Sequence, residues 1–115
     1  MLVVDDVGIG ENSWCSPNVF PCGGSGLEIG DYCSISAGVQ IYSHHTVEWA
    51  LSLGEEEPEE TPTKIGSGVY IGPQSIVQIG VTVRNQTVIG VMSFVNCDIP
   101  SAVRVWGVPV RIEEM

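Results

Sequence analysis

A large β-branched aliphatic residue recurs at every sixth position along two stretches of this chain. The column comprises Ile29, Ile35, Ile41, Ile65, Ile71, Val77, Val83, Ile89 and Val95, with one interruption after Ile41. An amphipathic helix would repeat its apolar positions at three and four residues, and an exposed strand would alternate at every second residue. A lone aliphatic at every sixth position instead indicates a short strand and a turn, repeated as a stack of similar units.

The other columns of the repeat support this interpretation. Glycine follows the aliphatic in several units, and small or β-branched residues such as Cys33, Val69 and Ser75 come four places after it. We expect the aliphatic and the small residue to point inward, and glycine to stand where the backbone turns sharply. With three units per turn, and weaker units at Ile9 and Cys15, the chain is predicted to form three to four coils of an all-β, single-stranded parallel β-helix.

The interruption of the period predicts an excursion loop at about residues 44–62. It contains His44, His45, a short helical segment near residues 47–51 and five glutamates within residues 55–60. Insertions in such stacks leave the coil and often carry function. The period is expected to stop after Pro100, so that residues 101–115 cap the last coil. At this length the whole chain, 1–115, is predicted to be one domain.

The charge balance excludes some classes of partner. Fourteen Asp and Glu residues against four Lys and Arg give a formal net charge of −10. So few cations leave no basic stripe to neutralise phosphates, which argues against binding to nucleic acid or to an anionic membrane. The uncharged stretch 65–83 is interrupted by Gly, Pro and Gln, so it does not predict a transmembrane span.

The N-terminal residues and the cysteines indicate in which cellular compartment the protein is expected. Residues 1–7 carry two aspartates and no basic residue, so they do not resemble a secretory signal. The four cysteines show neither a Cys-x-x-Cys pair nor the Cys/His spacing of a structural zinc site. We expect reduced thiols in a cytoplasmic protein without a metal.

Four stretches in fixed order resemble the hexapeptide-repeat acyltransferases, in particular small sugar or xenobiotic O-acetyltransferases. They read IGDYCSISAGVQIYSHHTVEWALS (29–52), KIGSGVYIGPQSIVQIGVTV (64–83), VIGVMSFVNCDIP (88–100) and VWGVPVRI (105–112). The resemblance implies a left-handed parallel β-helix and a homotrimer with its sites between subunits. It also implies transfer of an acetyl or other acyl group from coenzyme A to a hydroxyl or amine of a sugar, a sugar nucleotide or a xenobiotic.

The family's catalytic histidine falls on His44 in IYSHHT, with His45 beside it. An imidazole suits a general base because its unperturbed pKa, about 6.5, lies near the working pH. Whether His44 or His45 is the base stays open from the sequence. Glu48 is a candidate for orienting the imidazole, by its nearness in the chain.

The resemblance also implies a coenzyme site. Gly72 and Pro73 match the stretch along the thioester end, where a backbone N–H is a candidate for stabilising the oxyanion. The pantetheine arm is expected to pass Val91 and Asn96, and Arg111 matches a basic residue near the phosphates of the coenzyme.

Two departures from the family pattern keep an alternative function open. Relatives commonly have Ala at the place of Val91 and Lys at the place of Cys97, so the chain adds bulk and loses a cation where the coenzyme passes. A non-catalytic scaffold or binding protein is therefore the alternative. A zinc enzyme on this fold needs three histidines, which His44 and His45 cannot supply. The sequence also leaves open whether further N-terminal coils exist.

Overall fold

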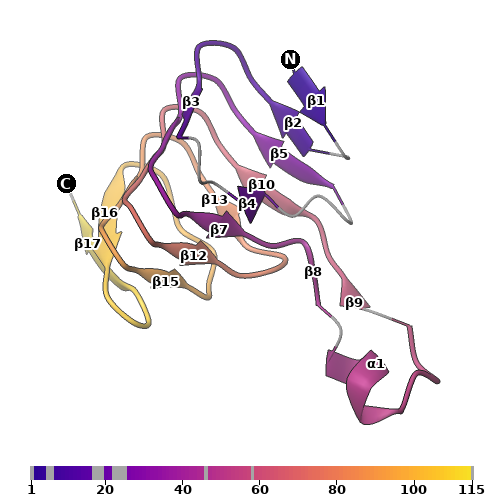
Figure 1. Ribbon diagram of the computed structural model, residues 1–115. Helices are drawn as coiled ribbons and strands as arrows, with labels where there is room; N and C mark the ends of the chain where they lie inside the picture. The colour runs from indigo at the N-terminus through magenta and orange to yellow at the C-terminus, as the bar shows by residue number, and fades with distance from the viewer. Residues whose placement is uncertain are drawn as a thin grey trace.

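The computed structural model describes residues 2–4, 7–16, 20–21, 26–45, 47–57 and 59–114. Over these residues the chain winds as a parallel β-helix whose short strands stack into three sheets (Figure 1). Successive strands of one coil enter successive sheets, and each strand pairs in parallel with the equivalent strand of the next coil. The expected all-β solenoid is therefore confirmed.

The three sheets are named here by their strands. Sheet A contains β2 (Val7–Ile9), β5 (Leu27–Ile29), β10 (Thr63–Ile65) and β13 (Thr82–Val83), with β1 (Leu2–Val4) antiparallel at its edge. Sheet B contains β3 (Trp14–Cys15), β6 (Ser34–Ile35), β11 (Tyr70–Ile71), β14 (Val88–Ile89) and β16 (Val103–Trp106), with β17 (Arg111–Glu114) antiparallel at its edge. Sheet C contains β4 (Phe20–Pro21), β7 (Gln40–Ile41), β12 (Ile76–Val77) and β15 (Phe94–Val95).

The column of aliphatics forms the core. Ile71 pairs with Ile35 on one side and Ile89 on the other, so identical side chains stack along the axis of the helix. Residues of this column from Ile29 to Val95 are buried. Burying one such side chain contributes about 1.5–3 kcal/mol, so the stack of coils is held mainly by this column.

The second inward column links the coils by hydrogen bonds. Ser13 Oγ donates to the Gly30 carbonyl oxygen at 2.7 Å, and Ser75 Oγ donates to that of Gly90 at 2.9 Å. The Cys33 thiol is in contact with the Gly66 carbonyl oxygen at 3.0 Å. A small polar side chain in this column therefore satisfies a carbonyl of the next coil that lies away from solvent.

The glycines that follow the aliphatics have a different role from the predicted one. We expected them where the backbone turns sharply, but Gly30, Gly66 and Gly72 do not have positive φ. A Cβ on Gly72 would lie 2.7 Å from the Val91 nitrogen, in the backbone of the next coil. These positions exclude a side chain because neighbouring coils approach closely there. The positive-φ corners are at other residues, such as Gly38, Gly68 and Gly80.

The repeat extends further at both ends than the sequence predicts. Near the N-terminus, β4 pairs in register with β7, so Pro21 stands opposite Ile41 and adds a unit after those at Ile9 and Cys15. Near the C-terminus, the period does not stop after Pro100, because Ile99 bridges to Val83 and β16 pairs with β14. Ile99 follows Val95 by four positions in place of six. Because this unit is shorter, a six-residue count does not detect the coil that continues through Ile99 and β16. The capping strand itself is β17.

The excursion is an arm that projects from the stack (Figure 1). Its stem is β8 (His44–His45) paired antiparallel with β9 (Glu59–Glu60), and α1 (Val47–Leu51) lies near its tip. The chain leaves sheet C after β7 to enter the arm and returns from it into β10 of sheet A. We call residues 44–60 the arm. No helix in the described parts of the chain is long and apolar enough to cross a membrane.

Candidate functional site

The base of the arm is fixed to the coil. The Thr61 N–H donates to the Ser43 carbonyl oxygen at 2.9 Å, and Thr63 Oγ1 donates to that of Tyr42 at 2.6 Å. The same Thr63 Oγ1 accepts from the Gly80 N–H at 3.0 Å. Because both ends of the arm are hydrogen-bonded at the coil, the stem that carries His44 starts from a defined point of the fold.

His44 and His45 lie in β8, opposite Glu60 and Glu59 of β9. Their side chains lie outside the described part of the structure, so the assignment of either as a base stays a prediction. Glu48 lies in the first turn of α1, on the same arm. Its role in orienting an imidazole also stays a prediction.

Three of the expected coenzyme residues lie together where sheet B passes into sheet C. We call this the B–C edge. Gly72 is buried there, and the Pro73 carbonyl oxygen accepts from the Met92 N–H of the next coil at 2.9 Å. Val91 stands beside Gly72, since a Cβ on that glycine would meet the Val91 backbone. The six-residue period brings these residues together because it places equivalent corners of successive coils on top of one another.

The backbone N–H groups next to Pro73 donate to carbonyl oxygens of neighbouring coils. The Gly72 N–H donates to the Ile89 carbonyl oxygen at 2.8 Å, and the Gln74 N–H donates to that of Ala37 at 3.0 Å. Pro73 has no N–H. These amide donors are thus used between coils, and the group that would stabilise an oxyanion stays a prediction.

Arg111 and Asn96 lie at different places. Arg111 begins β17 and pairs with Trp106, whose Cβ is near Gly90 at the B–C edge. Asn96 follows β15 and is exposed at the far end of the sheet C strands, where sheet C passes toward sheet A. The arm leaves the coil at this second edge, which we call the C–A edge. The structure therefore divides the predicted site residues between two edges.

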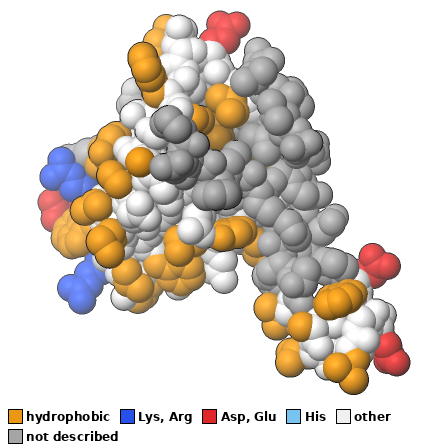
Figure 2. Space-filling view, viewed as in Figure 1, with side chains coloured by type: hydrophobic (Ala, Val, Ile, Leu, Met, Phe, Trp, Pro, Cys, Tyr) orange, Lys and Arg blue, Asp and Glu red, His pale blue; other side chains and the backbone are white. Residues whose placement is uncertain are grey.

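An exposed apolar strip runs along the B–C edge. Val91 is 62% exposed, Met92 is 66% exposed and Val108 is 75% exposed. Figure 2 shows hydrophobic side chains gathered at the side of the stack over β15, β16 and β17, and again over α1 on the arm. A strip of this kind suits the flexible, largely apolar arm of an acyl carrier.

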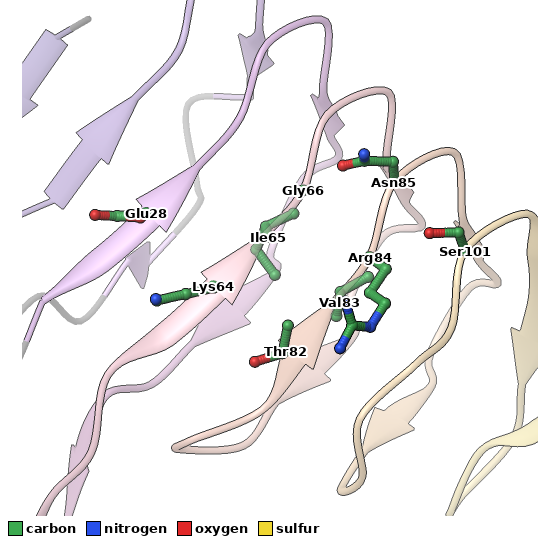
Figure 3. Close-up of a pocket in the computed structure, with 9 residues that line it drawn as sticks. All are labelled: Glu28, Lys64, Ile65, Gly66, Thr82, Val83, Arg84, Asn85 and Ser101. Carbon is green, nitrogen blue, oxygen red and sulfur yellow. The ribbon is translucent and has the colours of Figure 1, made fainter.

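The structure adds a pocket that the sequence did not point to (Figure 3). It is an open pocket of about 300 Å³ over sheet A, and it is lined by Glu28, Lys64, Ile65, Gly66, Thr82, Val83, Arg84, Asn85 and Ser101. Lys64 and Arg84 lie one residue before and one residue after inward aliphatics. The period identifies the inward residues but says nothing about which outward neighbours meet across coils, so the pocket was missed.

Two of the cysteines that the structure describes, Cys33 and Cys97, differ in their surroundings. Cys33 is buried, and burial raises the pKa of its thiol above the ordinary value of 9.0. Desolvation favours the neutral thiol, which is the less nucleophilic form. Cys97 is exposed. Among the described residues, no group of three or more His, Cys, Asp or Glu side chains is placed to hold a metal ion.

Comparisons with known proteins identify relatives of this chain. A galactoside O-acetyltransferase of Escherichia coli (strain K12) is 31% identical over 124 residues, covering 90% of this chain and 61% of the relative. A hexapeptide-repeat-containing acetyltransferase of Vibrio cholerae has a similar structure, with a TM-score of 0.86, 29% identity, and 94% and 61% of the two chains covered. No family model matches the sequence.

A galactoside acetyltransferase in complex with coenzyme A also has a similar structure. Its TM-score is 0.76, with 31% identity and with 95% of this chain and 64% of that chain covered. The chain thus spans a little under two thirds of the length of these relatives. These matches confirm the left-handed parallel β-helix. In both sequence and fold, the chain is similar to the hexapeptide-repeat acetyltransferases.

Proposed function

We propose that this protein transfers an acetyl or other acyl group from acyl-coenzyme A to a hydroxyl or amine of a small acceptor such as a sugar, a sugar nucleotide or a xenobiotic. The observation that carries the proposal is the arm with His44 in its stem, on a fold that matches a coenzyme A complex over 95% of this chain. The exposed apolar strip at the B–C edge supports it. We also propose that the protein works in the cytoplasm as a homotrimer.

The proposed reaction needs a base and a thioester. The His44 imidazole takes the proton of the acceptor hydroxyl or amine as that oxygen or nitrogen forms a bond to the acyl carbon. The bond between the acyl carbon and the coenzyme sulfur breaks, and the proton passes from the imidazole to that sulfur. The free thiol of coenzyme A and the acylated acceptor are the products. No metal is needed for this transfer.

The division of the site between two edges supports an assembly of several copies. Gly72, Pro73, Val91 and Arg111 are on or near the B–C edge, whereas Asn96 and the base of the arm are at the C–A edge. A second copy that presents its C–A edge to the B–C edge of the first would unite the two groups. A closed ring of such heterologous contacts gives a cyclic oligomer, and the homotrimer is the form we propose.

The test of the proposed base compares two neighbouring variants. His44→Ala is expected to lower kcat by about 10²- to 10⁴-fold, the usual contribution of a general base, without weakening acetyl-coenzyme A binding. His45→Ala serves as the matched control and should keep most of the activity. Acetyl transfer is measured as release of free coenzyme A thiol in the presence of candidate acceptors. Loss of activity in His45→Ala but not in His44→Ala would assign the general base to His45. If both variants were fully active, neither histidine would be the base.

The alternative is a non-catalytic scaffold or binding protein. Val91 projects at the B–C edge where relatives commonly have Ala, and Cys97 is an exposed, uncharged residue where they commonly have Lys. A scaffold predicts no saturable binding of acetyl-coenzyme A by the purified protein. The variant Val91→Ala/Cys97→Lys restores the family pattern. If it binds acetyl-coenzyme A and the wild type does not, the two departures block the groove; if neither protein binds, the scaffold alternative is supported.

A further inference from the structure

Two of the four basic residues of this acidic chain lie at one pocket. Lys64 and Arg84 line the sheet A pocket, and Glu28 is the one acidic residue among its described lining residues. The lining therefore carries one net positive charge within a chain of net charge −10. Arg104 and Arg111, the other two cations, are on β16 and β17 of sheet B.

The backbone register brings the two cations to the same side of the coil. On one side Lys64 pairs with Thr82, and Thr82 precedes Arg84 by two residues on the same face of the sheet. On its other side Lys64 pairs with Glu28. In Figure 3, Lys64 and Arg84 extend from neighbouring strands, and the guanidinium turns back along β13 toward Thr82. A Cβ on Gly66 would collide with Asn85 Oδ1 and with the backbone of Arg84 and Asn85, so this part of the lining is closed by the next coil.

The polar groups around the pocket favour an anion. The side chains of Lys64 and Arg84 have no hydrogen bond or ion pair to any described residue. Asn85 Oδ1 accepts from the Ser67 N–H at 2.8 Å, so the amide oxygen is engaged with the coil. Guanidinium and ammonium groups that lack an internal partner are the groups with which proteins bind phosphate oxygens.

The pocket lies near two features of the C–A edge, namely the turn that follows Asn96 and the base of the arm. The Thr82 N–H donates to Asp98 Oδ1 at 2.9 Å, which places the pocket next to the turn that follows Asn96. Lys64 lies in β10, the strand into which the arm returns. Arg84 follows β13 at the other end of the sheet A strands, so the pocket extends from the C–A edge across sheet A.

We propose that Lys64 and Arg84 form a phosphate-binding subsite. The inference rests on the proposed acyl transfer for its biological role, since the phosphate belongs either to the coenzyme or to a phosphorylated acceptor. The subsite itself is a property of the sheet A pocket. It raises the affinity for the phosphate-bearing ligand and takes no part in the chemical step.

The first experiment measures phosphate binding without any reaction. Inorganic pyrophosphate is titrated calorimetrically at low salt into the wild type, the double variant Lys64→Gln/Arg84→Gln and the control Arg104→Gln, which loses a cation from sheet B. We expect the double variant to weaken binding by about tenfold or more, because charge-assisted hydrogen bonds are lost, while Arg104→Gln changes it little. Equal affinities in all three proteins, or no binding to the wild type, would overturn the subsite.

The second experiment identifies the source of the phosphate. The KM is measured for acetyl-coenzyme A and for acetyl-pantetheine, which lacks the phosphates. A KM raised by the double variant for acetyl-coenzyme A alone, with kcat unchanged, assigns the subsite to the coenzyme. Weaker pyrophosphate binding with an unchanged KM for acetyl-coenzyme A assigns it to a phosphorylated acceptor. If neither donor is used by the wild type, the proposed acyl transfer fails, while the titration still decides the subsite.

Discussion

Glycine at the residue after the buried aliphatic shows how closely the coils approach one another. A Cβ built on Gly30 would lie 2.7 Å from the carbonyl carbon of Gly66 in the next coil. Backbone atoms cannot move aside as a flexible side chain can, so a methyl group there must push two coils apart. The same reason explains why Gly72 lies next to Val91 without a side chain between them.

Gly30→Ala is expected to lower the free energy of unfolding by about 1–3 kcal/mol, the usual cost of overpacking. Gly90→Ala is the matched control, because its nearest neighbour would be the Trp106 Cβ at 3.1 Å, in the final coil. Chemical denaturation of both variants compares the two costs. An equal or smaller loss for Gly30→Ala would contradict the close approach of the coil backbones.

The buried Cys33 thiol couples stability to alkaline pH. Burial raises its pKa in the folded state above the unfolded value of 9.0. Above that value the unfolded chain has lost the thiol proton while the folded chain retains it, so stability falls as the pH rises. Below pH 9 the thiol is neutral in both states, and this dependence disappears.

The Cys33→Ala variant tests this linkage. We expect the free energy of unfolding of the wild type to decrease more steeply than that of Cys33→Ala between about pH 8.5 and 10, by no more than roughly 1.4 kcal/mol per pH unit for one group. Denaturation curves at a series of pH values measure the difference. Parallel pH profiles for the two proteins would show that Cys33 is not the group responsible.

At the scale of elements, the sequence predicts the strands well because one column of aliphatics repeats in every unit. Ile71 and Ile89 are paired in the structure at the positions that the period gives them. The unit at Ile99 was missed because it follows Val95 by four residues instead of six, which breaks the count although the strand geometry continues. The grouping of Gly72, Pro73 and Val91 at the B–C edge could be predicted from the same period, because a six-residue repeat places equivalent corners of successive coils on top of one another.

Other parts of the site could not be predicted from the sequence. The position of Arg111 depends on the antiparallel return of β17, which no repeat encodes. The hydrogen bonds that occupy the Gly72 and Gln74 N–H groups depend on the exact neighbours in adjacent coils. Lys64 and Arg84 line one pocket because outward side chains of separate coils share one face, and an inward pattern carries no information about that face.

The tip of the arm is expected to be dispensable for the fold but required for turnover. Helix α1 has no buried residue, and Leu51 and Leu53 are 80% and 93% exposed. Replacing residues 47–57 by a short Gly-Ser linker should leave the thermal midpoint of the coil almost unchanged, since little apolar burial is lost within the chain.

The activity of the same variant gives the second readout. Acetyl transfer should fall by more than about tenfold, while release of coenzyme by hydrolysis is measured in parallel to detect donor binding. A large drop in the thermal midpoint would show instead that the arm supports the coil. Unchanged transfer would show that the arm tip has no part in the acceptor site.

At the scale of the whole molecule, the coils form a prism whose edges carry different chemistry. The B–C edge is apolar and exposed at Val91, Met92 and Val108, whereas the sheet A pocket carries Lys64 and Arg84. The arm projects from the C–A edge, away from β16 and β17 (Figure 1). Copies that join the B–C edge of one to the C–A edge of the next would cover the apolar strip and complete the proposed site together.

Binding of the acyl donor by such an assembly is the property on which the proposed function depends. To measure it, acetyl-coenzyme A is titrated calorimetrically at low salt into the purified protein, whose mass in solution is determined on the same sample. We expect a trimeric mass and saturable binding of one coenzyme per subunit. A monomeric protein that shows no saturable heat up to millimolar coenzyme would contradict the proposal, and the scaffold alternative would then take its place.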